Sequence, residues 1–542
     1  MNAPPIFALS FWRALAGSAF ASDHFVESPG RFGLCFALGL VAYGLWLAHR
    51  SLPRNGRKPN LPNELWLQVC SHLPLDSVRH LSSTDRHLYT TVRALGFSEY
   101  RLQVWHVDDK YYPSSKIESA FDRLAFFSSP TTAPHVRTCI VKGNFPPSIM
   151  QMDLPDFNEV VEPPRHMFMQ SFYDRLPLFS RLDSLQLHRI QLTQIGLANI
   201  CTLPSLTHIS MAHCSVAQGE ILDVDSLTLK VKSFSAYKNA GFNLPRLLCP
   251  ATLERLEICH WTGLAEFDIG PFPHVRALRM TDGLDVGTME LTDEFRVLTR
   301  FPAVRTLGLL YRNQLAGSAS PEAILPMLQE YIGDLDNLGP FIHHSALTSI
   351  ALFPYPYVPI TFDRFTDALE SAGIIELPKI VSLTVPFKAG GFRESNFTRL
   401  FTVFPRLEEF RLRFTPNEVD EDGLDTPGPL SLLDALANET LLPPTLKTLS
   451  VRWNYRYYEW ETLSEPEKIP ASDTYDFAEL RDKLLARCPH LTYLYVEAAH
   501  FSYLWWKQQE VWEVTTRSIE ETKRLSEKLP EHGDRLFEAG AC

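Results

Sequence analysis

Residues that could carry out chemistry are scattered along this sequence of 542 residues and form no recognisable catalytic pattern. The chain contains neither G-x-S-x-G nor H-E-x-x-H, the spacings that place a nucleophilic serine or bind a catalytic zinc, and it has no glycine-rich phosphate-binding loop. His343 and His344 are adjacent but lack a third ligand at metal-binding spacing, so a histidine pair at the surface or in the core is the better interpretation. The sequence therefore predicts that the protein is not an enzyme and has no metal or cofactor.

Charge and cysteine usage narrow the class of protein further. Asp and Glu outnumber Lys and Arg by 63 to 51, giving a formal charge of −12, which disfavours a protein whose main ligand is a nucleic-acid backbone. The nine cysteines are irregularly spaced and include no Cys-x-x-Cys pair, as expected of thiols in a reducing compartment. We therefore expect a cytoplasmic or nuclear protein that binds no nucleic acid.

One apolar segment near the N-terminus could anchor the chain on the cytosolic face of a membrane. Phe32 to Ala48 carry no charge over 17 positions, and as a helix they would span about 25 Å, the short end of what a bilayer requires. More basic residues follow this segment than precede it, which places the long C-terminal part in the cytosol. The alternative is a buried apolar stretch, and a signal-peptide core at residues 6–21 is disfavoured because Arg13 interrupts it. The region divides into a poorly ordered leader (1–31), a candidate transmembrane anchor (32–49) and a polar linker (50–59).

Residues 60–105 have the pattern of a small helical module. The apolar residues Leu61, Leu65, Val69 and Leu73 recur every fourth position and mark one stripe of a first helix. Pro62 suits the first turn of that helix, and Pro74 ends it. Two further helices are expected, with Val78 and Leu81 on the second and Leu88, Val92 and Leu95 on the third. Three short helices bury too little surface to be very stable alone, so we expect the module to pack against a neighbour or a partner.

This module resembles an F-box. The resemblance rests on Leu61-Pro62-x-Glu64-Leu65, on Leu73-Pro74, and on Leu81-Ser82 followed by Arg86-x-Leu88-Tyr89. The sequence departs from many F-boxes at Thr84-Asp85, before the third helix. F-box proteins use this module to dock on the adaptor subunit of an SCF-type cullin-RING ubiquitin ligase. The resemblance therefore implies an adaptor-binding set: Leu61, Pro62, Leu65, Val69, Leu73, Pro74 and Leu81.

Beyond residue 130 the chain is built from repeats. The pattern apolar-x-x-apolar-x-apolar begins at twelve positions: Val136, Leu182, Leu206, Val231, Leu253, Val275, Val304, Leu347, Ile380, Leu407, Leu446 and Leu491. Proline stands two residues before eight of these starts, where chance from 40 prolines in 542 residues predicts about one. The recurring proline therefore indicates that these segments are repeats of one structural unit.

Each repeat has the features of a short strand with a connection of variable length. Proline fixes the backbone as the chain approaches the strand, after which alternating apolar side chains point to one side. Stacked in parallel, such strands would share one core, and the pattern resembles the leucine-rich repeat, whose Asn/Cys position is filled here at Asn144, Cys214, Asn239 and Asn454. We therefore expect an α/β fold, with an irregular leucine-rich-repeat-like solenoid and a parallel sheet over residues 130–500. Its long start-to-start spacings would hold inserted loops or helices.

Two insertions and the C-terminal tail fall outside this pattern. Residues 416–430, which include the acidic run Asp420-Glu421-Asp422, and residues 460–475 are turn-rich and are interpreted as solvated loops. Residues 501–542 are expected to form a helical cap or tail that covers the last repeat. Its aromatic cluster, Trp505, Trp506 and Trp512, could instead be a docking surface.

The third, fifth and seventh residues of each repeat alternate away from the core and form the expected target-binding surface. This set includes Arg255, Glu257, Arg279, Glu409, Arg411, Arg413, Arg452, Tyr493 and Tyr495. Arg and Tyr are enriched at the dominant positions of protein interfaces, and the mixed charge favours a protein target. Together with the F-box resemblance, this predicts a substrate-receptor subunit of an SCF-type ubiquitin ligase, which binds the adaptor (and through it the cullin) and an unknown protein target. The alternative is a membrane-tethered leucine-rich-repeat scaffold without ligase function.

Overall fold

The computed structural model is a mixed α/β protein with a large, mostly parallel β-sheet, which confirms the predicted fold class at that level. It divides into two compact units, residues 1–252 and 253–542. The structure describes residues 63–71, 73, 75–82, 86–103, 114–143, 163–217, 221–237, 239, 244–259, 270–281, 297–310, 321–353, 360–388, 393–415, 429–438, 441–453, 476–497, 502–508 and 511–516. The leader, candidate anchor, linker, and nearly all of the two insertions lie outside this set. Among the described helices, none is long and apolar enough to cross a membrane.

The first unit begins with three short helices packed around a small core. They occupy the stretches in which the sequence predicts helices: α3 (Asn63–Ser71), α4 (Leu75–Ser82) and α5 (Arg86–Gly96). Cys70, Val78 and Val92 form the centre of the core, and Leu73 and Leu95 pack against them. Because three short helices bury little surface alone, contacts with the rest of the unit matter for the stability of the module.

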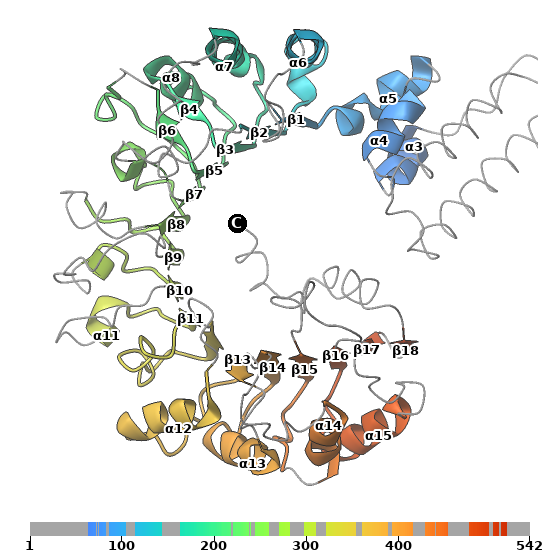
Figure 1. Cartoon of the computed structure of the whole chain (residues 1–542), viewed down its shortest axis with the longest axis vertical. Helices are drawn as coiled ribbons and strands as arrows, with labels where there is room; N and C mark the ends of the chain where they lie inside the picture. Colours follow the sequence, from blue (N-terminus) through green and yellow to red (C-terminus); the bar gives the residue numbers. More distant parts are fainter. Residues whose placement is uncertain are drawn as a thin grey trace, which may run out of the picture. The chain divides into compact units, whose positions relative to one another are not determined.

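Parallel strands form the sheet of the first unit. Their order is β1 (Glu99–Gln103), β2 (Thr138–Lys142), β3 (Ser184–His188), β5 (His208–Ala212) and β7 (Ser233–Tyr237), and β4 (Gln191–Leu192) pairs separately with β6 (Ser215–Val216). The connections contain α6 (Ser114–Phe127), α7 (Pro163–Arg175), α8 (Gln194–Cys201) and the 3-10 helices η2 (Ala133–His135), η5 (Leu176–Leu178) and η6 (Leu244–Leu247). Figure 1 shows α7 and α8 on one side of these strands, so the opposite side is left for side chains that are not part of the core.

The second unit continues the same strand–connection plan. Its parallel strands are β8 (Arg255–Cys259), β9 (Ala277–Thr281), β10 (Thr306–Leu310), β11 (Glu330–Gly333), β12 (Ser349–Leu352), β13 (Ser382–Lys388), β14 (Glu409–Thr415), β15 (Thr448–Trp453) and β16 (Tyr493–Glu497). Helices α11 (Pro321–Ile324), α12 (Phe362–Ser371), α13 (Glu394–Val403), α14 (Pro429–Asn438) and α15 (Phe477–Arg487) lie in the connections. In Figure 1, α12 to α15 all lie on one side of this sheet. The long spacings at these places hold helices, one of the two alternatives that the sequence leaves open.

The recurring proline lies in a β-turn that leads into the strand. In Phe301-Pro302-Ala303-Val304, the Val304 N–H donates to the Phe301 carbonyl at 3.2 Å, and Val275 and Phe272 make the same bond at 3.4 Å. Proline is favoured at the second position of such a turn because its fixed φ already matches the turn. Phe272 and Phe301 are buried and stack on each other, with ring centres 5.5 Å apart. The Phe-Pro pair therefore both turns the chain and packs one repeat against the next.

The Asn/Cys position of the repeat is used in the first unit. The side-chain oxygen of Asn239 accepts the Cys214 N–H at 2.8 Å, and its Nδ2 donates to the Met211 carbonyl at 2.9 Å. One asparagine thus satisfies backbone groups of the preceding repeat at the point where the strand ends. Asn144 and Asn454 lie outside the described residues.

β1 and β11 are among the strands that the repeat pattern does not predict. β1 falls inside the predicted helical module, yet it pairs with β2, and the Ser98 carbonyl accepts the N–H groups of Arg137 and Thr138. β11 lies in the 43-residue spacing between the repeats at Val304 and Leu347, which the sequence analysis interpreted as an inserted loop or helix. The strand ends in Gly333, where a Cβ would collide with the Leu309 carbonyl oxygen. A glycine required by this close approach interrupts the apolar pattern and hides the repeat.

The C-terminal segment begins as a strand hairpin, so the predicted helix is wrong there. β17 (Ser502–Gln508) pairs antiparallel with β16, and β18 (Val511–Thr516) pairs antiparallel with β17. Tyr503, Leu504 and Trp505 are consecutive and all buried. A strand that is buried on both faces shows no alternation, so periodicity could not distinguish it from a helix.

Candidate functional site

Helix α3 exposes leucines that the core of the module does not use. Leu65 is 44 % exposed and Leu67 is 37 % exposed, whereas Cys70 on the same helix is buried. The two leucines are two residues apart and so point to different sides of the helix, which means that a partner contacting both must enclose it. Transfer of either side chain out of water would favour association. Leu65 belongs to the adaptor-binding set that the F-box resemblance implies.

The structure describes the side chains of only two residues of that set. Leu65 is exposed, and Leu73 is half-buried against the cluster of Cys70, Val78 and Val92. Leu73 thus contributes to the core of the module, a role that the stripe alone did not predict. Five side chains of the set lie outside the described residues: Leu61, Pro62, Val69, Pro74 and Leu81, of which Val69 is in α3 and Leu81 in α4.

Arg79 on α4 ties the helical module to the sheet. Its Nε donates to the carbonyl of Gly96 at the end of α5, and its Nη2 donates to the carbonyl of Glu99 at the start of β1, both at 2.9 Å. A cation beside the last carbonyls of a helix also complements the helix dipole. Because the two carbonyls flank the turn between α5 and β1, one guanidinium fixes the direction in which the sheet leaves the module.

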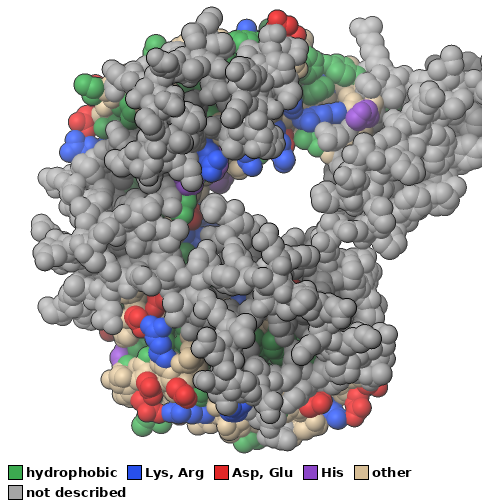
Figure 2. Space-filling view, in the orientation of Figure 1, with side chains coloured by type: hydrophobic (Ala, Val, Ile, Leu, Met, Phe, Trp, Pro, Cys, Tyr) green, Lys and Arg blue, Asp and Glu red, His purple; other side chains and the backbone are tan. Residues whose placement is uncertain are grey.

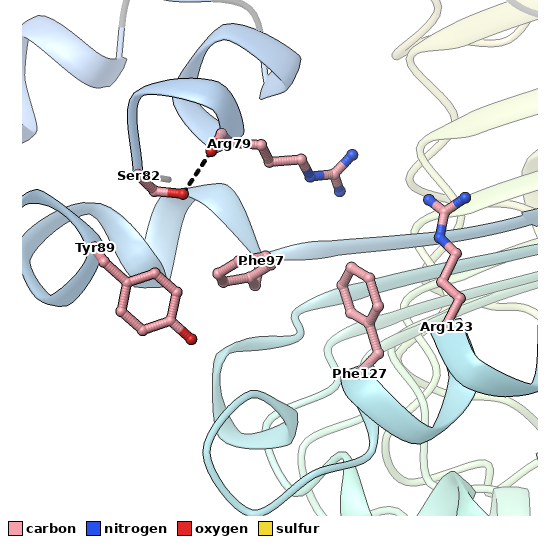
Figure 3. A pocket seen from close by; sticks show the side chains of 6 residues that line it. All are labelled: Arg79, Ser82, Tyr89, Phe97, Arg123 and Phe127. Atoms are coloured by element: carbon pink, nitrogen blue, oxygen red, sulfur yellow. Dashed lines mark hydrogen bonds between the residues drawn. The ribbon is translucent and has the colours of Figure 1, made fainter. Parts of the chain in front are cut away.

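A pocket of about 360 Å³ lies beside Arg79. Figure 3 shows its lining, which consists of Arg79, Ser82, Tyr89, Phe97, Arg123 and Phe127. The guanidinium carbons of Arg79 and Arg123 lie 6.0 and 5.9 Å from the centre of the Phe127 ring. Phe97 also contacts Phe127 edge-to-face at 5.9 Å. The Phe97–Phe127 contact joins the residue that follows α5 to α6, so the pocket belongs to the joint between the module and the sheet.

In the second unit, the predicted target-binding charges pair with one another. Arg279 and Glu257 on adjacent strands are 3.5 Å apart, and Arg411 and Glu409 on β14 are 3.6 Å apart. These residues, together with Arg255 and Arg413, alternate with buried ones, as the sequence predicts. We call this side of each sheet, opposite the buried apolar residues, its polar face. Here it carries charges of both signs.

Three residues of the predicted target-binding set are buried, so the expectation that they are exposed is wrong. Arg452 is 9 % exposed, Tyr493 2 %, and Tyr495 is fully buried. The Arg452 guanidinium stacks on the Tyr495 ring at 4.4 Å, and the Tyr495 hydroxyl donates to Glu497 at 2.6 Å. Leu504 and Trp506 of β17 pack against the two tyrosines. Because β17, which the sequence did not predict, covers this part of the sheet, these residues are packed at its end.

The polar face of the first unit carries a row of basic residues that the sequence analysis missed. Lys142 and His188 are the last residues of β2 and β3, and Arg189 and His213 follow β3 and β5. We call these four the basic row. The His188 and His213 rings are 5.5 Å apart, and His213 contacts Tyr237 at 5.3 Å. Figure 2 shows Lys, Arg and His side chains gathered over the region where Figure 1 places β1 to β7.

The groups of the basic row act on one another electrostatically. Burial lowers the pKa of His188, and the positive charges of Arg189, His213 and Lys142 lower this pKa further. A signal for the row was present in the sequence, because Lys142, His188 and Tyr237 are the seventh residues of the repeats that begin at Val136, Leu182 and Val231. Arg189 and His213 lie one position beyond the pattern and could be found only from the structure.

The two adjacent histidines and two of the buried cysteines are held in the structure by local contacts and burial. His344 is buried, with Nε2 2.9 Å from the Leu325 carbonyl and with Nδ1 accepting the Ala346 N–H, and His343 Nε2 lies 3.0 Å from the Ala372 carbonyl. The pair is thus divided, with His344 in the core and His343 at the surface. Burial raises the pKa of Cys214 to about 12 and that of Cys488 to about 11, so these thiols remain protonated. Within the described part of the chain, no group of three or more potential ligands could hold a metal ion.

No protein-family model matches this chain, and no curated protein matches it at a significant level.

Proposed function

We propose that this protein is a substrate-receptor subunit of an SCF-type cullin-RING ubiquitin ligase. Its F-box-like module would bind the adaptor, and its leucine-rich-repeat-like strands would bind a protein target. The observation that best supports the proposal is the exposed Leu65 on α3, at a position that the F-box resemblance assigns to the adaptor. Such a receptor works by proximity, because it holds a target near a catalyst that other subunits supply.

The polar faces of the two sheets support the target-binding half of the proposal. Adjacent parallel strands hold their outward side chains in rows at fixed spacing, so the side chains lose little freedom when a partner binds. Arg255, Arg279 and Arg411 lie on such rows in the second unit, and the basic row lies on the first. Arginine is one of the residue types that contribute most to protein interfaces.

Capture of the purified adaptor subunit by the full chain tests the adaptor half. We expect Leu65→Glu to abolish capture, because the substitution places an unpaired charge where burial is needed. Leu178→Glu is the matched control, since Leu178 is a leucine of the same unit that is 51 % exposed. Neither position is buried, so neither change should disturb the fold.

Two results would contradict this half of the proposal. One is a wild-type chain that never captures the adaptor. The other is a Leu65→Glu variant that captures it as well as Leu178→Glu does. A chain that fails to capture the adaptor but sediments with membranes would support the membrane-tethered scaffold instead.

A further inference from the structure

We infer that the basic row of the first unit, with Tyr237 beside it, binds a short acidic peptide segment in extended form. This inference rests on the proposed function and deepens it, because it states the chemistry of the target: a run of carboxylate side chains. It also moves the principal target contact from the second unit, where the sequence analysis expected it, to the first.

The register of the strands gives the distance from one end of the basic row to Tyr237. Lys142 lies opposite His188, His188 opposite Ala212, and Ala212 opposite Tyr237. Neighbouring strands are about 4.8 Å apart, so the three steps from Lys142 to Tyr237 cover about 14 Å. An extended chain advances about 3.3 Å per residue, and the row therefore matches about five residues of peptide.

Two members of the row lie without an acidic partner in the part of the chain that the structure describes. Among the described residues, neither Lys142 nor Arg189 forms an ion pair with a carboxylate, and the Nε of Arg189 is buried without a hydrogen-bond partner. The acidic side chains of this sheet lie near the strand starts, where Glu99 pairs with Arg101 and Asp183 accepts a hydrogen bond from Thr207. The described acidic side chains thus lie away from the carboxyl ends of the strands, where the basic row lies. A bound carboxylate would pair with the Lys142 ammonium, which is exposed.

The backbone holds two members of the row in a costly conformation. Arg189 and His213 both have φ of +54°, a region that favours glycine. Their N–H groups donate to the carbonyls of Ala212 and Tyr237, both at 2.8 Å, which continues the strand ladder by one residue. Glycine would adopt this conformation without strain. A residue that carries a side chain at such a position is therefore typical of a functional site, where that side chain is needed.

The charge of the whole chain favours a peptide over a nucleic acid. A nucleic-acid surface needs a long track of cations, and the row runs from β2 to the residue after β5 in a protein of formal charge −12. Carboxylates on a peptide require fewer cations, and the peptide backbone can lie against the His213 and Tyr237 rings.

Fluorescence anisotropy with a labelled peptide tests the inference. The probe is a fluorescein-labelled peptide with a central run of glutamates, compared with the same peptide carrying glutamines and with a single-stranded oligonucleotide of equal length. The test variant is Lys142→Gln with Arg189→Gly, in which glycine suits the positive φ. The control is Arg137→Gln with Arg181→Gln, which removes the same charge from two exposed residues of the same unit that precede β2 and β3.

We expect the glutamate peptide to bind and the glutamine peptide not to bind. The test variant should weaken binding by about tenfold or more, and the control by less than about twofold. If the double variant is unstable, Lys142→Gln alone replaces it in the test. Lys142 is exposed, so this single substitution should not disturb the fold. Equal effects of test and control, no binding of the glutamate peptide, or tighter binding of the oligonucleotide would overturn the inference. Adaptor capture, measured on the same proteins, shows separately whether the proposed function stands.

Discussion

Among single residues, Arg79 has the clearest consequence for how the helical module is held. Its two hydrogen bonds end on backbone carbonyls at the end of α5 and the start of β1. Backbone carbonyls cannot be moved by a side-chain rotation, so a lost donor leaves them without that partner. The module is small, so a tie of this kind carries a larger share of its stability than it would in a large domain.

We therefore expect Arg79→Met to lower the free energy of unfolding by about 1–3 kcal/mol, the usual range for a partly buried, charge-assisted hydrogen bond. Methionine keeps most of the aliphatic stem and removes the donors. The control is Arg123→Met, because Arg123 is an exposed residue of α6 whose guanidinium lies near the same Phe127 ring. Denaturant titration of the full chain measures both changes. Equal losses in the two variants would show that the hydrogen bonds of Arg79 do not have this role.

The titration of His188 makes the stability of the folded chain depend on pH. Its pKa lies below the ordinary histidine value because of burial and the neighbouring positive charges of Arg189, His213 and Lys142. The unfolded chain therefore binds a proton at a higher pH than the folded chain does. Stability is unaffected well above pH 6.5, and it falls as pH decreases through 6.5 toward the lower pKa of the folded state.

The measurement is the midpoint of denaturant unfolding between neutral and mildly acidic pH. His188→Gln should reduce the loss of stability on acidification relative to the wild type, because glutamine does not titrate. His208→Gln is the matched control, since His208 is an exposed histidine of the same sheet, 3.8 Å from Asp183. A His188→Gln variant with an unchanged pH profile would contradict this account.

At the scale of elements, the repeat in which a proline precedes each strand was the most informative part of the sequence. It predicted the strands of the repeats, because a β-turn proline and alternating apolar residues are local properties, and it left open whether the long connections hold loops or helices. β11 was missed because Gly333 is fixed by a neighbouring strand, and the β17–β18 hairpin was missed because Tyr503, Leu504 and Trp505 are buried on both faces. In each case the cause is a contact with another strand, which a local pattern does not contain.

The candidate site likewise contains residues that local spacing predicts and residues that it does not. The alternation that puts Arg255 and Arg279 on the polar face could be predicted from spacing alone. The burial of Arg452, Tyr493 and Tyr495 could not, because it depends on Leu504 and Trp506 of β17. Arg189 and His213 were also beyond prediction, since their positions depend on a left-handed backbone after the strand.

The hairpin makes a further prediction at this scale. In a strand, Trp505 and Trp506 point to opposite faces, and Trp505 is fully buried whereas Trp506 is half-buried. We expect Trp505→Ala to lower the free energy of unfolding by about 3–5 kcal/mol, and Trp506→Ala by clearly less. Denaturant unfolding followed by circular dichroism measures both variants. Equal losses would be inconsistent with the strand geometry described for β17.

At the scale of the whole molecule, the location of α3 and the basic row within one compact unit matters for the proposed function. Both belong to residues 1–252, and Arg79 fixes α5 to β1 between them. A target held on the basic row would therefore stay at a constant distance from an adaptor held on α3. Constant spacing is what a proximity mechanism needs, because a freely swinging target would spend less time near the catalyst.

The proposed function also requires that this molecule lie in the cytosol or nucleus, and two sequence motifs report on that. Asn396-Phe-Thr398 and Asn438-Glu-Thr440 are formal glycosylation acceptors, and the structure shows Asn438 exposed at the end of α14 and Asn396 half-buried in α13. Asn438 is therefore the better reporter.

We expect no glycosidase-sensitive mass on the protein, and no difference in mobility between the wild type and Asn438→Gln before or after glycosidase treatment. Alkaline carbonate extraction of the full chain and of a variant lacking residues 32–48 would show whether that segment anchors it. A glycan at Asn438 would place the sheets on the lumenal side, away from any ubiquitin ligase, and would refute the proposed function.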